Sequence, residues 1–529
     1  MKEPDKKLYE KLWASAQQLR ANSSLKLNEI SEPILGLIFL KFAEVKFEQA
    51  KKEISEDRSL IIRDANITRE RPLNSSDFKE RGVLFVPELA TYKYLMDLPE
   101  NENIGKAINE AMKAIEDENK DLAGVLPQNY TSLVKSATEN NELLLTLLKN
   151  FNQIPSDLSG DAFGGIYEYF LGQFALAEGQ NGGEFFTAQP IVKLMVEVLE
   201  PYKGRIYDPA CGSGGMFVQS AEFVRRHKEY GVSVMDKITI FGQEKTSSTV
   251  NIAKMNLAIH GLSGKIVQAN SYYEDPFKSS NKFDFVLANP PFNVSGVDKN
   301  KQVVIDPKKI EGDERFYLGL PLTQKGEVTN ANFLWAQIFA NSLNEKGRAG
   351  FVMANSASDA SHAEKVILKK LIESDIVDVM IGVGSNMFLN VTLSCTLWFF
   401  DKDKKNTKRK GKVLFINAQD IFTPIDRAHN TWTLEQIQEI ASIVRRYRGE
   451  KDAEKYEDIK GRCKVATLEE IKANDYSLNP GRYVEIIEKP TDGVDFGKRM
   501  KKLINDFTTL TKEAHKLEDK IVEDWKKIL

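Results

Sequence analysis

The chain has 529 residues, enough for about two to four domains, and 42% of them are hydrophobic, which permits a large buried core. Its 73 Lys and Arg and 76 Asp and Glu give a formal net charge of −3, which does not indicate a nucleic-acid binder. Three distant cysteines exclude a disulfide framework and favour a reducing cytoplasm. The charged N-terminus lacks an apolar signal segment and no apolar run reaches membrane-spanning length, so neither secretion nor membrane insertion is expected. The five scattered histidines indicate no metal centre.

The first part of the chain is predicted to be helical. From Lys7 to about Pro155 the apolar residues recur at helical spacing, most densely at residues 33–47. We therefore expect a helical N-terminal domain at residues 1–155.

An α/β domain is predicted next, at residues 156–425. Short runs rich in Ile, Val and Phe alternate here with longer segments of helical period, which is typical of a doubly wound parallel sheet. Two polar loops interrupt the pattern, at residues 293–330 and 401–412. The second loop is strongly basic, and we expect it to be solvated, with contact to nucleic-acid phosphates as the alternative. The predicted strands are residues 205–207, 238–242, 265–269, 283–288, 349–354, 376–381 and 393–400.

The C-terminal region, residues 426–529, ends in a predicted helix at about residues 496–529. Apolar residues step along it by alternating intervals of three and four, which is a heptad pattern. The other positions are mostly charged, which suits a helix exposed on one side. This apolar seam either packs against the chain's own core or binds a partner helix. The seam consists of Met500, Leu503, Phe507, Leu510, Ala514, Leu517 and Ile521.

A glycine-rich turn follows the first predicted strand. Without Cβ atoms, its glycines let the backbone turn tightly and let a ligand reach main-chain amides at the start of the next helix. Such a turn suits charged phosphate or carboxylate groups, although its GxGG spacing matches neither the dinucleotide-binding nor the phosphate-loop motif. A purely structural turn remains the alternative. The residues are Asp208, Pro209, Ala210, Cys211, Gly212, Ser213, Gly214, Gly215 and Met216.

The second predicted strand ends in an acidic residue, Glu244. A carboxylate at this place in a doubly wound domain can accept both ribose hydroxyls of an adenosine. Alone, Glu244 would be read as a helix-capping acid. Together with the glycine turn it favours an adenosine-containing cofactor.

The fourth predicted strand runs directly into Asn289, Pro290, Pro291 and Phe292. Ligands of doubly wound domains bind at the carboxyl ends of strands, and the two prolines fix the backbone direction there. The tetrad suits methyl transfer to a planar amino or amide nitrogen, whose conjugated lone pair is a poor nucleophile. The Asn289 side-chain oxygen and the Pro290 carbonyl could each accept one N–H and localise that lone pair. Phe292 could stack on the ring of a base flipped out of a duplex.

These motifs, in this order, resemble the modification (M) subunit of type I restriction-modification systems, an S-adenosyl-L-methionine-dependent DNA adenine-N6 methyltransferase. The resemblance covers nearly the whole chain. It includes residues 161–168 and 182–187, which resemble the opening of that family's catalytic domain, and residues 242–244 with 253–257, which resemble its ribose-binding strand and helix. It implies a doubly wound methyltransferase domain between a helical N-terminal domain and a C-terminal helical tail.

The resemblance also implies roles for single residues. Phe186 and Thr187 would contact the cofactor, Asp208 and Gly212 its methionine part, and Glu244 its ribose. Asn270 stands at the adenine-contacting position, which is often acidic in related enzymes, and Ala188 follows Thr187 where the family usually has Pro. The implied catalytic residues are Asn289, Pro290, Pro291 and Phe292, and the implied cofactor-binding set is Phe186, Thr187, Asp208, Ala210, Gly212, Ser213, Gly214, Gly215, Glu244 and Asn270.

The family's partners are implied in the same way. Its M subunits bind DNA with a specificity (S) subunit that reads the sequence, so a net charge of −3 on M is tolerable. Two copies of M flank one S, and the C-terminal region of M packs against helices of S. A restriction (R) subunit supplies the motor and nuclease, and this chain shows no GxxxxGK[ST] loop of its own.

Two other functions are compatible with the residues. An Asn-Pro-Pro-aromatic tetrad also occurs in methyltransferases that act on the N5 amide nitrogen of protein glutamine, but those enzymes are shorter and have a different N-terminal domain. A catalytically silent scaffold would keep the fold and its partners only. The intact tetrad, Glu244 and the glycine turn argue against it.

Overall fold

The computed structural model describes residues 6–21, 27–65, 73–79, 81–99, 102–133, 139–158, 160–178, 187–227, 234–388, 394–451, 453–485 and 496–528. The chain divides into two compact units, residues 1–484 and 485–529. None of the described helices is both long and apolar enough to cross a membrane.

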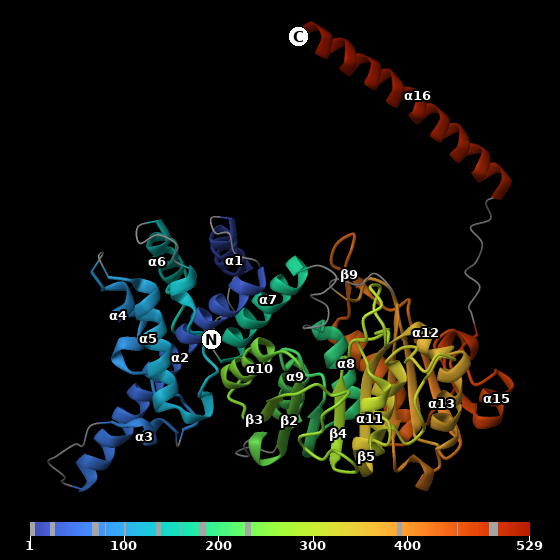
Figure 1. Ribbon diagram of the computed structural model, residues 1–529, viewed down its shortest axis with the longest axis horizontal. Helices are drawn as coiled ribbons and strands as arrows, with labels where there is room; N and C mark the ends of the chain where they lie inside the picture. The colour runs from blue at the N-terminus through green and yellow to red at the C-terminus, as the bar shows by residue number, and fades with distance from the viewer. Residues whose placement is uncertain are drawn as a thin grey trace. The chain divides into compact units, whose positions relative to one another are not determined.

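The N-terminal part is helical, as predicted (Figure 1). Its core is centred on α2, whose middle turns bury Leu35, Ile38 and Phe39 completely. Helix α5 shows why these segments fold: its apolar residues recur at helical spacing along one buried face, and Asn103 caps its first turn by accepting from the Lys106 amide. The α-helices are α1 (Lys6–Ala21), α2 (Leu27–Ala65), α3 (Ser75–Lys79), α4 (Tyr92–Met96), α5 (Ile104–Glu118), α6 (Glu139–Phe151) and α7 (Gly160–Glu178).

Beyond the N-terminal helices, the described residues contain a nine-stranded sheet in the order β11-β8-β6-β7-β5-β4-β1-β2-β3. Strand β7 runs antiparallel to β5 and β6, and β11 antiparallel to β8, while the other neighbours are parallel. The strands are β1 (Gly204–Asp208), β2 (Ile238–Glu244), β3 (Gly264–Gln268), β4 (Phe283–Ala288), β5 (Leu343–Ala354), β6 (Val377–Val383), β7 (Cys395–Asp401), β8 (Lys412–Ala418) and β11 (Cys463–Thr467).

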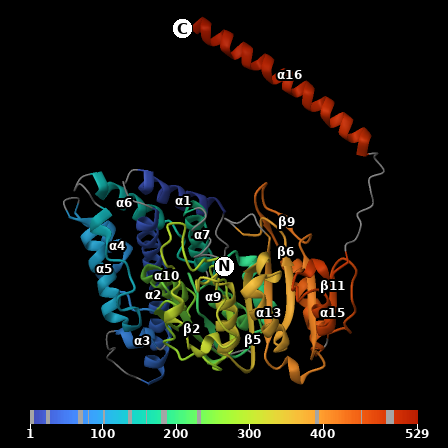
Figure 2. The same ribbon diagram turned by 45° about the vertical axis from the view of Figure 1, so that its right-hand side comes forward.

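Helices cover both faces of this sheet, which confirms the doubly wound architecture (Figures 1 and 2). One core lies under α8, α9 and α14, and the other under α11 and α13. Neighbouring strand residues alternate between them: Ile206 belongs to the first core and Tyr207 to the second. The helices are α8 (Gln189–Leu199), α9 (Gly215–His227), α10 (Ser247–Ile259), α11 (Asn332–Ser342), α12 (Asn355–Ser358), α13 (His362–Glu373), α14 (Leu434–Arg448) and α15 (Leu468–Ala473).

Each of the seven predicted strands has a counterpart, but β8 and β11 were not predicted. The basic run before β8 is also only partly solvated. Lys404 and Arg409 are buried, and their cations pair with Asp375 and with Asp378 and Asp401, respectively. Part of the run that we expected to be solvated is therefore a buried cluster of ion pairs. The other long loop, residues 293–330, is also packed: it adds Ile305, Ile310 and Phe316 to the core under α11 and α13.

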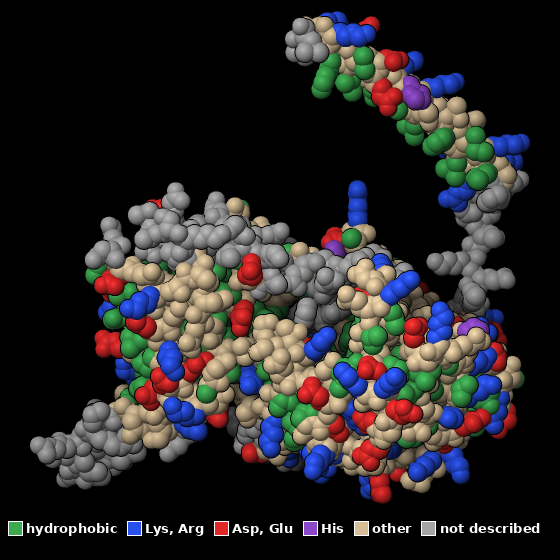
Figure 3. Space-filling view, viewed as in Figure 1, with side chains coloured by type: hydrophobic (Ala, Val, Ile, Leu, Met, Phe, Trp, Pro, Cys, Tyr) green, Lys and Arg blue, Asp and Glu red, His purple; other side chains and the backbone are tan. Residues whose placement is uncertain are grey.

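The C-terminal unit contains the predicted helix, α16 (Phe496–Ile528). Its large heptad residues are exposed, from 45% of the surface of Met500 to 72% of that of Phe507, and Ala514 is exposed as well. Figure 3 shows hydrophobic side chains gathered along one side of this helix. Within its own unit, the apolar seam of α16 is therefore open to solvent.

Candidate functional site

The glycine turn joins the end of β1 to the start of α9. Gly212 and Gly214 have φ angles of 51° and 81°, in the left-handed region that favours glycine. The turn is fixed to its neighbours: the Cys211 amide donates to the Gln243 carbonyl over 3.0 Å, and the Asn256 side chain donates to the Ser213 carbonyl over 2.8 Å. A Cβ built on Gly215 would meet no atom of the described residues within 4 Å, so among these residues the start of α9 faces open space.

Glu244, at the end of β2, lies against this turn. One carboxylate oxygen accepts from the Gly212 amide over 3.3 Å, and the other accepts from the Thr246 amide over 3.0 Å. The predicted acid and the predicted turn are thus brought together. The long first bond is one that a ligand hydroxyl could readily replace.

Asp208, the last residue of β1, is 1% exposed. Burial raises the pKa of its carboxyl well above the usual range, the hydrogen bond from the Ala210 amide opposes this shift, and the Glu244 charge adds to it. Among the described residues no Lys or Arg forms an ion pair with Asp208 or Glu244. Two neighbouring acids without a cation favour a positively charged ligand.

Asn270 lies just after β3 at the same edge. Its side-chain oxygen accepts from the Tyr272 amide over 3.1 Å, and the next residue, Ser271, donates to the Pro209 carbonyl over 2.5 Å. The turn after β3 is therefore tied to the turn after β1.

Asn289 follows β4, which is the direct neighbour of β1. Tyr207 pairs with Val286, so the tetrad begins beside the end of β1. The Asn289 side-chain amide donates to the Thr187 hydroxyl over 3.0 Å, whereas its Oδ1 is buried and has no hydrogen-bond partner within the described residues. A buried acceptor without a donor is costly, so a donor from a ligand or a water would stabilise this arrangement.

The rest of the tetrad supports Asn289. Pro290 is buried, and Pro291 and Phe292 are half-buried. Phe292 packs against the cores on both faces of the sheet. Of the predicted cofactor contacts, Phe186 lies outside the described residues, while Thr187 lies beside the tetrad, where its hydroxyl accepts from the Asn289 side-chain amide.

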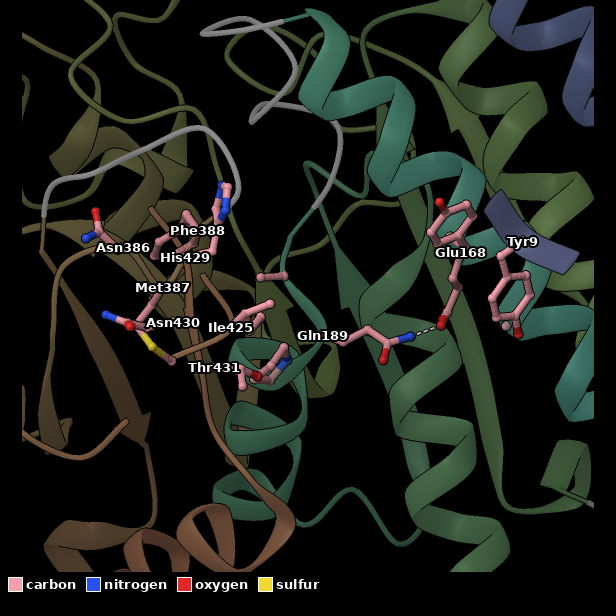
Figure 4. Close-up of a pocket in the computed structure, with 14 residues that line it drawn as sticks. Tyr9, Glu168, Gln189, Asn386, Met387, Phe388, Ile425, His429, Asn430 and Thr431 are labelled. Atoms are coloured by element: carbon pink, nitrogen blue, oxygen red, sulfur yellow. Dashed lines mark hydrogen bonds between the residues drawn. The ribbon is translucent and has the colours of Figure 1, made fainter. Parts of the chain in front are cut away.

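A cavity of about 380 Å³ lies beside Thr187, and most of its lining was not predicted (Figure 4). Glu168 on α7 accepts there from the Gln189 side chain at the start of α8. Burial raises the pKa of Glu168 to about 7, against the lowering effect of Lys193. Sequence analysis noted Glu168 only as part of a motif. The lining residues are Tyr9, Gly165, Glu168, Tyr169, Ala188, Gln189, Pro190, Asn386, Met387, Phe388, Ile425, His429, Asn430 and Thr431.

The sheet and the residues at its carboxyl edge define the class: the fold is that of an S-adenosylmethionine-dependent methyltransferase. Family models agree, since residues 158–492 match the N-6 DNA methylase model and residues 8–151 the HsdM N-terminal domain model.

Comparisons with individual proteins narrow this class. The chain is 36% identical over 522 residues to the type I restriction enzyme MjaIX methylase subunit of Methanocaldococcus jannaschii, covering 97% of this chain and 90% of that one. It is 38% identical to the HindI methylase subunit of Haemophilus influenzae, over 78% of this chain and 88% of the relative. The crystal structure of a type I methyltransferase subunit from Streptococcus thermophilus superposes with a TM-score of 0.71, at 25% identity, over 90% and 99% of the two chains. The chain therefore belongs to the methylase (M) subunits of type I restriction-modification systems, which are adenine-specific DNA methyltransferases, and the resemblance noted in the sequence is confirmed.

Proposed function

We propose that this chain transfers a methyl group from S-adenosyl-L-methionine to N6 of an adenine in a DNA sequence chosen by a separate specificity subunit. The observation that carries the proposal is the buried, unpartnered Oδ1 of Asn289, held beside the end of β1 by the Thr187 hydroxyl. An adenine amino group supplies the N–H donor that this oxygen needs.

The residues at the edge of β1 and β2 fit the cofactor. Its methionine ammonium and sulfonium groups are cations, and their positive charge would stabilise the ionised carboxylates of the buried Asp208 and the neighbouring Glu244. Its ribose hydroxyls would take the place of the long bond between Glu244 and the Gly212 amide. Ala210, Ser213, Gly214 and Gly215 would line the turn, and Asn270 would contact the adenine ring. When bound, S-adenosylmethionine supplies an electrophilic methyl group.

The tetrad supplies the rest of the chemistry. The Asn289 oxygen and the Pro290 carbonyl accept the two N–H bonds of the target amino group and draw its lone pair out of conjugation. Phe292 stacks on the flipped base, and Pro291 keeps the turn rigid. Positioning and hydrogen bonding thus activate the nitrogen without a general base in contact with the ring.

The exposed apolar seam of α16 supports an interaction with a partner subunit. A helix that exposes Leu503, Phe507 and Leu510 together in water is stabilised when a partner helix covers them. We assign this partner as the specificity subunit, with two copies of M flanking one S and an R subunit joining for cleavage. DNA readout then belongs to S, which agrees with the net charge of −3 on this chain. The site of action would be the cytoplasm.

The experiment is long-read modification sequencing of host DNA after expression of this chain with its neighbouring specificity gene. We expect N6-methyladenine at one split motif. The matched control is Asn289→Ala, which should lose the mark and keep cofactor binding. Methylation by that variant would refute the role of Asn289, and no new DNA mark from the wild type would refute the proposed substrate.

A further inference from the structure

A short hairpin stands beside the catalytic edge. It is formed by β9 (Thr423–Pro424) and β10 (Asn430–Thr431), and residues 425–429 make its tip. Figure 1 shows it projecting beyond the end of the sheet. Ile425 is 64% exposed, and Arg427 is also exposed. Within the described residues Ile425 belongs to none of the hydrophobic cores, so its exposed aliphatic side chain is available to a partner.

Hydrogen bonds make the tip rigid. The Asp426 carboxylate accepts from the Ala428 amide over 2.7 Å and from the His429 amide over 2.8 Å, and it contacts the His429 ring at 2.8 Å. The Ile425 amide donates to the His429 carbonyl over 2.9 Å. The Asp426 carboxylate is thus used in hydrogen bonds within the tip. The exposed Arg427 guanidinium is a positive charge that the tip offers to a partner.

The base of the hairpin is anchored in the fold. The buried Trp432 indole donates to the Ile421 carbonyl over 2.7 Å. The Asn430 amide donates to the carbonyl of Asn386, which lies shortly after β6. The hairpin is therefore a fixed projection and keeps its position without a partner.

Its position relates it to catalysis. Ile425 and His429 line the cavity of about 380 Å³ together with Ala188 and Gln189, around the start of α8 (Figure 4). These two residues directly follow Thr187, the hydrogen-bond partner of Asn289. The tip therefore lines the same cavity as the residues that adjoin the Thr187–Asn289 pair.

We propose that the β9–β10 hairpin contacts the DNA duplex next to the extruded adenine, with Ile425 packing against the base stack at the gap and Arg427 binding a backbone phosphate. This inference rests on the proposed function, because only base extrusion leaves such a gap. Aliphatic side chains stabilise disrupted base steps by packing against them, and arginine binds phosphate by charge-assisted hydrogen bonds. Both side chains lie on one rigid tip, so they engage one duplex together.

The test uses the M and S subunits as a complex, with a duplex carrying 2-aminopurine at the target adenine. Ile425→Ser should lower the fluorescence gain on binding and reduce kcat by about tenfold, with unchanged cofactor affinity. Arg427→Ala should weaken DNA binding for specific and unrelated duplexes alike, and should reduce the slope of log K against log salt by about one. The matched controls are Ile459→Ser and Lys405→Ala, which are exposed outside the hairpin and should leave both readouts unchanged.

Other outcomes have separate meanings. Unchanged fluorescence and salt slope in the two hairpin variants would overturn the inference. Loss of the complex with S on size exclusion, at normal cofactor affinity, would assign the hairpin to a subunit interface and would also overturn it. If the wild-type complex neither extrudes nor methylates the target base, the proposed function itself fails, and the hairpin variants are not needed to see this.

Discussion

The Asn289 side-chain amide donates to the Thr187 hydroxyl, and this single bond of 3.0 Å fixes which end of the amide is left for the substrate. The nitrogen is occupied and the oxygen is buried without a partner in the described residues. We therefore predict that Thr187 positions Asn289. The sequence resemblance predicts that Thr187 also contacts the cofactor.

Replacing Thr187 tests this role. Thr187→Val keeps the shape and removes the acceptor, so the Asn289 amide can rotate; we expect kcat to fall by about 10- to 100-fold, with little change in cofactor affinity. Thr187→Ser restores the hydroxyl and should recover most of kcat. Single-turnover methylation and cofactor titration measure the two quantities. Weaker cofactor binding with a normal kcat would return Thr187 to the cofactor.

Glu244 should govern cofactor affinity. Glu244→Ala removes the carboxylate that faces the glycine turn, and the loss of charged hydrogen bonds should raise the cofactor Kd by about 10- to 100-fold. Calorimetric titration of the purified chain measures it. Glu439→Gln, an exposed acid on α14, is the control and should bind normally. Equal affinities for both variants would show that Glu244 only supports the turn.

Glu168 predicts a pH dependence of stability. Burial raises its pKa in the folded chain from 4.5 to about 7, so the folded chain holds a proton that the unfolded chain has lost. Stability therefore falls as pH rises from 4.5 to about 7, by an amount of the order of 3 kcal/mol, and changes little from this group above that range. Glu168→Gln should flatten this part of the curve in urea unfolding. An unchanged difference between pH 5 and pH 7 would contradict the prediction.

The seam of α16 should be required for assembly. Phe507→Glu places a charge in the middle of the apolar stripe, and we expect it to abolish the complex with a specificity subunit. Thr509→Glu adds the same charge away from the stripe and should assemble normally. Size exclusion of the co-expressed subunits separates the two results. Cofactor affinity should be equal in both variants, because the site lies in the other unit of the chain.

Local patterns predicted the first strands well, because β1, β2 and β4 are short apolar runs bounded by turn residues. They failed at β8, because the basic run that precedes this strand indicates a solvated loop. Lys404 and Arg409 are buried only because acids from distant segments, Asp375 and Asp378, neutralise them. No local pattern carries that information.

The difference between local and distant information also explains which parts of the candidate site could be predicted. The glycine turn, Glu244 and the tetrad are contiguous motifs, so they could be found in the sequence. The cavity beside Thr187 could not, because it is assembled from α1, α7, the start of α8, the loop after β6 and the hairpin. Five separate stretches of chain meet there. The motif at residues 161–168 and the residue after Thr187 mark two of them, but no local pattern shows which distant stretches they meet.

Helix α10 has a further consequence for how the chain folds and evolves. It buries Met255 and Ile259 in the core of the N-terminal helices, while Ala253 and Leu257 belong to the core on the sheet. A side chain between them, Asn256, holds the glycine turn. The N-terminal helices and the sheet therefore share helix α10 and should unfold in one cooperative transition. Recombination between relatives would have to exchange α10 together with the N-terminal helices, or the cofactor turn would lose its support.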